Sequence, residues 1–251
     1  MTTVAELWRY PVKSFQGEKV DQLHVGAGGT AGDRVLAVVD PEARKVLSAE
    51  RYADLLMASA RLTDDDVVIT LPSGASYAAS DPGVHDALSA WLDKEVRLEP
   101  PPTDGVFPME MYSGMSDEET PLFDWGGPPG TWLDLADAHF LTTASLRAAE
   151  ALHPEGQWDV RRFRPTALLS SDADGYVEES WATLMLGGVT ADVLMPTMRC
   201  SMPSRAQPGL DRDKAIGTSI RDGNVNNLGI YCTVTQAGVI AVGATVAVPS
   251  K

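Results

Sequence analysis

The chain has 251 residues, 44% hydrophobic and 22% charged, which suits one large or two small folded domains. Its net charge of -15 repels phosphate groups, and no segment reaches the ~18 apolar residues of a membrane span. We therefore expect neither nucleic acid nor a membrane as a partner. Two cysteines allow no disulfide framework and no CxxC zinc site, and the N-terminus carries no secretion signal, so a cytoplasmic location is expected.

The first hundred residues predict short strands, rich in Val, Leu and Ile and separated by turn residues. The expected strands are 5–10, 19–25, 34–40, 45–48, 67–71, 75–78 and 95–98. A helix is expected after Asp81 and Pro82, because apolar residues then recur at helical spacing. The proline run at 100–102 continues neither element, so we place a first domain at 1–102.

The second domain is expected at 103–251. Its first part, 103–133, is acidic and rich in Gly and Pro, which predicts a linker or a solvated surface loop, or else a loop that docks a partner or covers a site. The elements expected after it are strands at 139–142, 162–170, 183–186 and 190–195, a helix at 144–153, and a hairpin of 230–236 and 239–248. Many short strands and few helices predict a mainly β fold with some α, of the β-barrel type.

The glycine-rich segment 26–32 mimics a dinucleotide-binding fingerprint, because it reads GxGxxA directly after an expected strand. That fingerprint requires a helix to begin at the glycines, where helix N–H groups meet a pyrophosphate. A strand-like segment, 33–39, follows instead. We therefore expect a β-turn and no nucleotide site.

Cys200 lies in a loop between Pro196 and Pro203, after an expected strand, where functional residues concentrate. The neighbouring Arg199 favours the thiolate, which is both a nucleophile and a ligand for soft metals. The competing interpretation is a packed structural thiol. Cys232 is expected in the core of the C-terminal hairpin.

Basic and hydroxyl side chains form small groups in an otherwise acidic chain. In a strand, Arg162 and Arg164 would face one side and bind a phosphate, or else pair with surface carboxylates. The junction at 142–146 offers hydroxyl and free N–H groups that hold an anion or simply cap the following helix. The turn at 10–14 and the Asp33-Arg34 pair add further cations.

Taken in order, these motifs resemble the MOSC family, named for the C-terminal domain of molybdenum cofactor sulfurase, with its N-terminal β-barrel partner. The segment Arg9-Tyr10-Pro11-Val12-Lys13-Ser14, followed by Gly32-Asp33-Arg34, is similar to the opening of the barrel partner. The segments similar to the MOSC part are Thr143-Ala144-Ser145-Leu146, Arg162-Phe163-Arg164-Pro165, Arg199-Cys200 and the glycine-rich 238–243. The resemblance covers nearly the whole chain.

The resemblance implies a molybdenum–molybdopterin cofactor, with Cys200 as the catalytic residue and the metal ligand. The residues that match cofactor-binding positions are Lys13, Ser14, Arg34, Thr143, Ser145, Arg164, Thr166 and Arg199. Two departures from the family pattern stand out. Thr166 replaces an asparagine that many relatives have, and residues 203–210 replace a T-x-D-P-x-T-G run.

N-reductive members of the family cleave the N–O bond of N-hydroxylated small molecules with two electrons, which the resemblance implies for this chain. Two cysteines cannot hold an iron–sulfur cluster that needs four, so electrons are expected from a separate flavin or iron–sulfur reductase. Two alternatives stay open. Cys200 carries a persulfide and passes sulfur to an acceptor, or the protein carries the cofactor without turnover.

Overall fold

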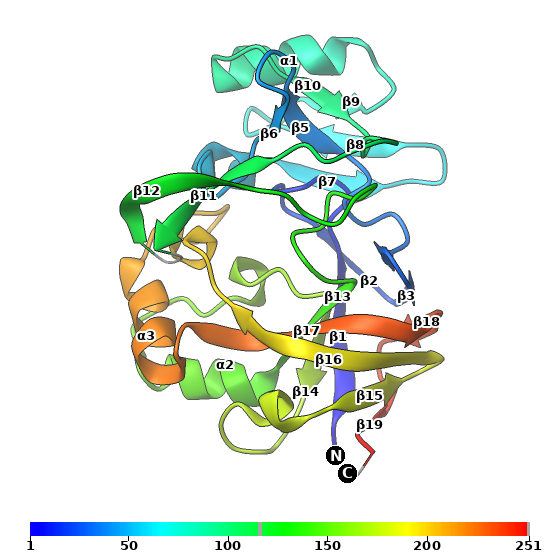
Figure 1. The fold of residues 1–251 in the computed structure, drawn as a ribbon, viewed down its shortest axis with the longest axis vertical. Helices are drawn as coiled ribbons and strands as arrows, with labels where there is room; N and C mark the ends of the chain where they lie inside the picture. The colour runs from blue at the N-terminus through cyan, green and yellow to red at the C-terminus, as the bar shows by residue number, and fades with distance from the viewer. Residues whose placement is uncertain (115–116, 250–251) are drawn as a thin grey trace.

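The computed structural model describes residues 1–114 and 117–249, and these form nineteen strands and three α-helices (Figure 1). The prediction of a mainly β fold with some α is confirmed. None of the helices in these two ranges has the length and hydrophobicity needed to cross a bilayer.

An eight-stranded sheet occupies the lower half of the molecule in Figure 1 and curls into a half-barrel. Its strands, in spatial order, are β19 (Val246–Ala247), β15 (Thr183–Leu186), β16 (Val189–Met198), β17 (Asn227–Gln236), β13 (Ala138–Thr142), β14 (Ala167–Ser170), β1 (Thr3–Arg9) and β2 (Glu18–Val20). β13 and β14 are parallel and the other neighbours antiparallel. Alternating apolar residues of these strands form one core, in which Leu7, Phe140 and Ile230 are fully buried.

The upper half holds a five-stranded and a three-stranded sheet with one helix (Figure 1). The five strands are β10 (Arg97–Glu99), β5 (Ala37–Asp40), β6 (Lys45–Val46), β11 (Met109–Gly114) and β12 (Asp117–Trp125). The three are β7 (Ser59–Leu62), β8 (Val67–Thr70) and β9 (Ser76–Ala78), and the helix is α1 (Gly83–Leu92). Val84 and Leu88 of α1 pack with Ile69 in a second core.

Smaller elements complete the fold. β18 (Gly238–Ala241), β3 (Gln22–Gly26) and β4 (Gly29–Thr30) form a third sheet, and α2 (Thr143–Glu150) and α3 (Lys214–Asn224) pack together against the large sheet. Four 3-10 turns are Ala53–Met57, Val160–Arg162, Val177–Ser180 and Met202–Ser204. The expected turn within 26–32 is confirmed, since β3 returns as β4 through Gly28, whose φ of +83° suits glycine.

Three predictions of local structure are wrong. No strand begins at 162, because residues 160–162 form a 3-10 turn, Arg164 has a left-handed φ of +52°, and Pro165 lacks an N–H. The expected C-terminal hairpin does not form, since β17 pairs with β13 and β16 while β18 pairs with β3. The segment 19–25 is two strands, β2 and β3, which belong to different sheets.

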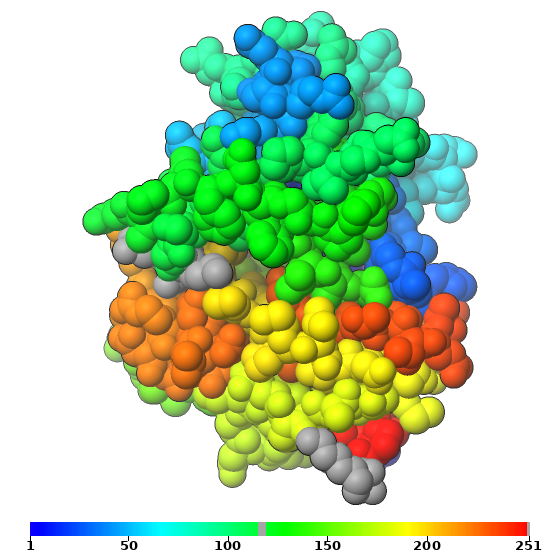
Figure 2. All heavy atoms as spheres, in the orientation of Figure 1, coloured from blue at the N-terminus to red at the C-terminus, as the bar shows by residue number. Residues whose placement is uncertain are grey.

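The large sheet contains strands from both sides of the predicted domain boundary at residue 102. β1 and β2 lie in the large sheet, and β3 pairs with β18 near the C-terminus, so the first thirty residues lie with the second half of the chain. The segment 103–133, expected as a linker or loop, contains the β11–β12 hairpin, which extends across the face between the two halves (Figures 1 and 2). The side chains of 117 and 118, in the expected acidic loop, lie outside the described residues.

Candidate functional site

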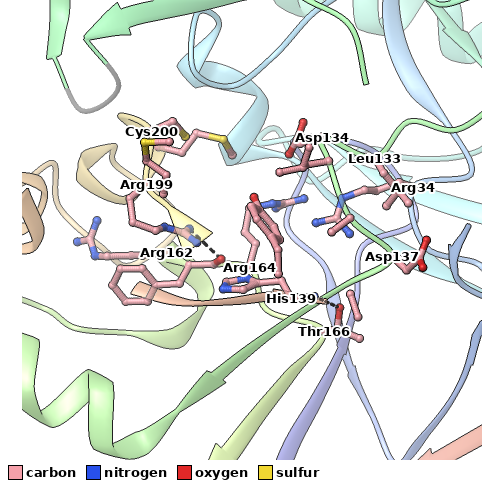
Figure 3. Close-up of a pocket in the computed structure, with 17 residues that line it drawn as sticks. Arg34, Leu133, Asp134, Asp137, His139, Arg162, Arg164, Thr166, Arg199 and Cys200 are labelled. Carbon is pink, nitrogen blue, oxygen red and sulfur yellow. Dashed lines mark hydrogen bonds between the residues drawn. The ribbon is translucent and has the colours of Figure 1, made fainter. Parts of the chain in front are cut away.

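A pocket with about 660 Å³ of empty space, part of it open to solvent, lies at the start of β13 and the end of β16, beside the middle of β17 (Figure 3). Its lining combines residues 133–139, residues 162–166 and the end of β16 with one residue from the N-terminal half, Arg34. Five of the predicted site residues come together here, namely Arg34, Arg164, Thr166, Arg199 and Cys200. Segments far apart in sequence therefore meet at Cys200.

Cys200 lies two residues after the end of β16, and a pair of reciprocal bonds fixes its loop. The backbone N–H of Arg199 donates to the carbonyl of Asn226 at 2.8 Å, and Asn226 Nδ2 donates back to the carbonyl of Arg199 at 2.7 Å. The thiol is partly exposed to the pocket. The loop thus presents a single sulfur atom at a fixed position.

Burial and, after it, the Glu50 carboxyl raise the pKa of the Cys200 thiol to about 12, against the lowering effect of Arg199. Arg199 therefore acts in the expected direction, but it is outweighed. Glu50 is almost fully buried and accepts hydrogen bonds from the Tyr112 backbone N–H, at 2.8 Å, and from the Cys200 side chain. Burial raises the pKa of Glu50 to about 7. Sequence reasoning did not single out this carboxyl.

The arginines carry donors without partners among the described residues. Arg164 Nη1 donates to the Phe15 carbonyl at 2.5 Å, but its buried Nη2 has no protein acceptor. Arg199 Nη2 donates to the Phe163 carbonyl at 3.0 Å, and its buried Nε likewise has none. Burial lowers the pKa of Arg164 to about 10, so this guanidinium remains charged at neutral pH. Buried donors left unpaired are costly, so their presence fits a bound acceptor.

Tyr10 connects two of these cations. Its ring lies beneath the guanidinium of Arg164 at 4.2 Å and near that of Arg34 at 5.4 Å, while Arg34 also pairs with Asp33. Burial raises the pKa of Tyr10, and its buried hydroxyl has no partner among the described residues. Two guanidinium groups thus lie against the same aromatic ring.

Three predicted site residues have a strained backbone. Ser14, Arg34 and Arg164 adopt φ values of +70°, +48° and +52°. Residues other than glycine rarely adopt this region, and such strain persists at sites where the surrounding structure requires it. Of these three residues, Arg164 also carries an unpaired buried donor.

Lys13 lies beside the pocket rather than in its lining. Its ammonium donates to Asp134 Oδ1 at 2.5 Å and to the Trp132 carbonyl at 2.9 Å. Burial lowers the pKa of Lys13, and the nearby carboxylate of Asp134 partly offsets this. Burial alone would raise the pKa of Asp134, but the cations around it hold that pKa below its usual value. Lys13 thus acts on the pocket through Asp134, which does line it.

Ser14, Thr143 and Ser145 do not line the pocket. Ser14 Oγ accepts from the Ala49 backbone N–H at 3.0 Å, and Thr143 Oγ1 donates to the Ser171 carbonyl at 3.2 Å. Ser145 is fully buried, and its hydroxyl donates to Glu178 at 2.7 Å. The junction at 142–146 therefore caps α2, through Thr142, rather than facing the pocket.

Ser145→Ala is expected to leave the ligand content of the purified protein unchanged while lowering stability. Removing the buried bond to Glu178 costs about 1–2 kcal/mol. Urea unfolding measures the loss, and elemental analysis of the same preparation measures any bound metal. A fall in metal content without a change in stability would place Ser145 in the binding site instead.

Several lining residues were missed by sequence reasoning. Asp134, His139 and Tyr231 face the pocket from residues 133–139 and from β17. Burial, with Arg199 nearby, lowers the pKa of His139 well below its usual value, so this ring is neutral at pH 7. Its backbone pairs with Thr166, whose N–H donates to the His139 carbonyl at 2.7 Å. No local motif marks these residues, because the sheet pairing brings them to Cys200.

Comparisons with known proteins identify two domains in the chain. Residues 1–94 match the MOSC N-terminal beta barrel domain, and residues 134–247 match the MOSC domain. The chain is 25% identical over 226 residues to mitochondrial amidoxime-reducing component 1 of Homo sapiens, covering 79% of this chain and 64% of that protein. It thus spans slightly less than two thirds of that relative. It is 24% identical over 285 residues to mitochondrial amidoxime reducing component 2 of Bos taurus, covering 96% and 81%.

Two solved structures are also similar. The YUAD protein from Bacillus subtilis has 10% identity and a TM-score of 0.48, over 98% of this chain and 94% of that one. YiiM from Geobacillus stearothermophilus has 12% identity and a TM-score of 0.34, over 56% and 72%.

Proposed function

This chain belongs to the MOSC family, and we propose that its pocket holds a molybdenum–pterin cofactor through Cys200 and reduces N-hydroxylated compounds. The observation that carries the proposal is the set of unpaired buried donors around one thiol in a protein of net charge -15. Such donors suit an anionic ligand, and a thiolate suits a soft metal.

Each group in the pocket fits one part of such a cofactor. Cys200 offers the sulfur ligand, and a cation at that sulfur favours the thiolate over the buried thiol. Arg164 and Arg199 offer free N–H groups to the cofactor's anionic or pterin side. When bound, the cofactor supplies a metal that exchanges two electrons with the substrate. Lys13 keeps the carboxylate of Asp134 paired, which lowers the repulsion between Asp134 and an anion.

The overall reaction breaks the N–O bond of the substrate. Two electrons and two protons are consumed, the oxygen leaves as water, and the nitrogen gains hydrogen in its place. The described residues include two cysteines, and an iron–sulfur cluster needs four ligands. We therefore propose a separate flavin or iron–sulfur protein as the electron donor. The names of the two mitochondrial relatives support reduction of amidoximes as the chemistry to test.

The protein purified from a molybdenum-replete host is expected to contain metal and pterin close to one per chain. It is also expected to oxidise a reduced viologen dye when an amidoxime is added. Protein without metal that instead carries labile sulfur on Cys200 would overturn the proposal in favour of a sulfur carrier. Metal-loaded protein without activity toward N-hydroxylated compounds would overturn the reductase part alone.

A further inference from the structure

A second space adjoins the pocket at Cys200 and differs from it in character. It has about 690 Å³ of empty volume, part of it open to solvent, and shares Asp134, Leu135, Met198, Cys200 and Tyr231 with the first. Arginine side chains line the pocket described above, whereas mainly apolar side chains line this second space. Its other lining residues are Met111, Phe123, Trp125 and Met195. We call this space the apolar recess.

The apolar recess is walled by one face of the β11–β12 hairpin. In its antiparallel register Met109 lies opposite Trp125 and Met111 opposite Phe123. Side chains on a strand alternate, so Phe123 and Trp125 share a face with Met111, whereas Leu122 lies on the other face. The hairpin thus turns an apolar face toward Cys200, and Figure 2 shows its strands crossing between the two halves of the molecule.

Several contacts hold the hairpin in this position. Trp125 Nε1 donates to the Asp134 carbonyl at 2.9 Å, next to the pocket. On the outer face, Lys45 pairs with Asp124 at 2.8 Å. Toward the tip, Glu119 lies 3.7 Å from the ammonium of Lys214 on α3. The apolar wall is therefore connected to both halves of the molecule.

We propose that the apolar recess is the subsite for the body of the substrate, and that it selects N-hydroxylated compounds with a flat apolar group. This inference rests on the proposed function, because it assumes that the reacting N–O group lies at Cys200. Methionines adapt to different shapes, and the rings of Phe123 and Trp125 offer flat contact surfaces. The described residues that line the apolar recess include no Lys, Arg or His, so the recess offers no partner to an anionic substituent.

The test compares Phe123→Ser with Leu122→Ser in the cofactor-loaded protein. The two side chains are matched, being 38% and 39% exposed on opposite faces of β12. Phe123→Ser is expected to lower kcat/KM about tenfold for benzamidoxime and less than about twofold for acetamidoxime, which lacks the ring. Leu122→Ser is expected to change neither. A second matched pair on β16 is Met195→Ser with the exposed Leu194→Ser.

A binding measurement separates the subsite from the reaction. Benzamidine has no N–O bond and cannot be reduced, so calorimetric titration reports binding alone. We expect Phe123→Ser, but not Leu122→Ser, to weaken its binding by a factor similar to that for benzamidoxime. If Phe123→Ser alone weakens benzamidine binding in a protein that reduces no amidoxime, the recess is a binding site but the proposed reductase function is wrong. Equal effects of the matched variants, or equal loss for both amidoximes, would overturn the recess as the subsite.

Discussion

Cys200→Ala is expected to lower the molybdenum content at least about tenfold. Substitution of residues that only contact a metal ligand already lowers metal affinity about 10–100-fold, and here the ligand itself is removed. Cys200 is the only thiol among the described pocket residues, since Cys232 is buried in β17 within the core of the large sheet. The oxygen and nitrogen groups that remain bind a soft metal less well. Elemental analysis and pterin fluorescence of the purified variant measure the loss.

Cys232→Ala is the matched control for that experiment. The side chain is fully buried, and removing its sulfur is expected to cost about 1 kcal/mol of stability while leaving the metal content at the wild-type level. Circular dichroism verifies that both variants are folded. Wild-type metal content in Cys200→Ala would mean that the metal is held elsewhere or through the pterin alone.

Arg162→Met is expected to destabilise the protein more than any other change considered, by about 3–5 kcal/mol. Arg162 is fully buried, and its guanidinium donates to four backbone carbonyls. The acceptors are Gln157 at 2.8 Å, Pro203 at 3.0 Å, Arg205 at 2.9 Å and Asp211 at 2.7 Å. The variant leaves all four without this donor, and it releases the segment that follows Cys200. Urea unfolding of the wild type and the variant measures the difference.

Arg161→Met provides the comparison within the same turn. Arg161 pairs with Asp159 at a partly exposed position, and such pairs contribute about 1 kcal/mol or less. A small effect of Arg162→Met, equal to that of Arg161→Met, would show that the four hydrogen bonds of Arg162 contribute little to stability. Comparison of the two variants thus separates the effect of burying a guanidinium group from the effect of its charge.

The sequence predicted elements well where local pattern decides them. β1, β8, β15 and α1 lie within a few residues of their expected ranges, because alternation and helical spacing are properties of neighbouring residues. The C-terminal hairpin failed because the partners of β17 and β18 are distant in sequence. α3 was not predicted, since Ile216 and Ile220 are its only fully buried large apolar residues and give little periodicity.

For the site, the structure brings five of the nine candidate residues to one pocket, but the motifs did not predict what each one does. Arg34, Arg164, Thr166, Arg199 and Cys200 line one pocket, whereas Lys13, Ser14, Thr143 and Ser145 do not. Ser145 belongs to the same set of motifs yet bonds to Glu178, because a hydroxyl at a helix start serves the helix as readily as a ligand. Asp134 and Tyr231 carry no motif and reach the pocket only through tertiary structure.

The place of β1 in the large sheet also constrains how the protein folds during synthesis. β1 lies between β2 and β14, and Thr3 pairs with Ser170. The ribosome delivers the chain from its N-terminus, so β1 emerges long before the strand that completes its hydrogen bonds. Pairings with such high contact order form slowly. The nascent chain therefore carries an open strand edge through most of its translation, and its sheet closes only when the second half has emerged.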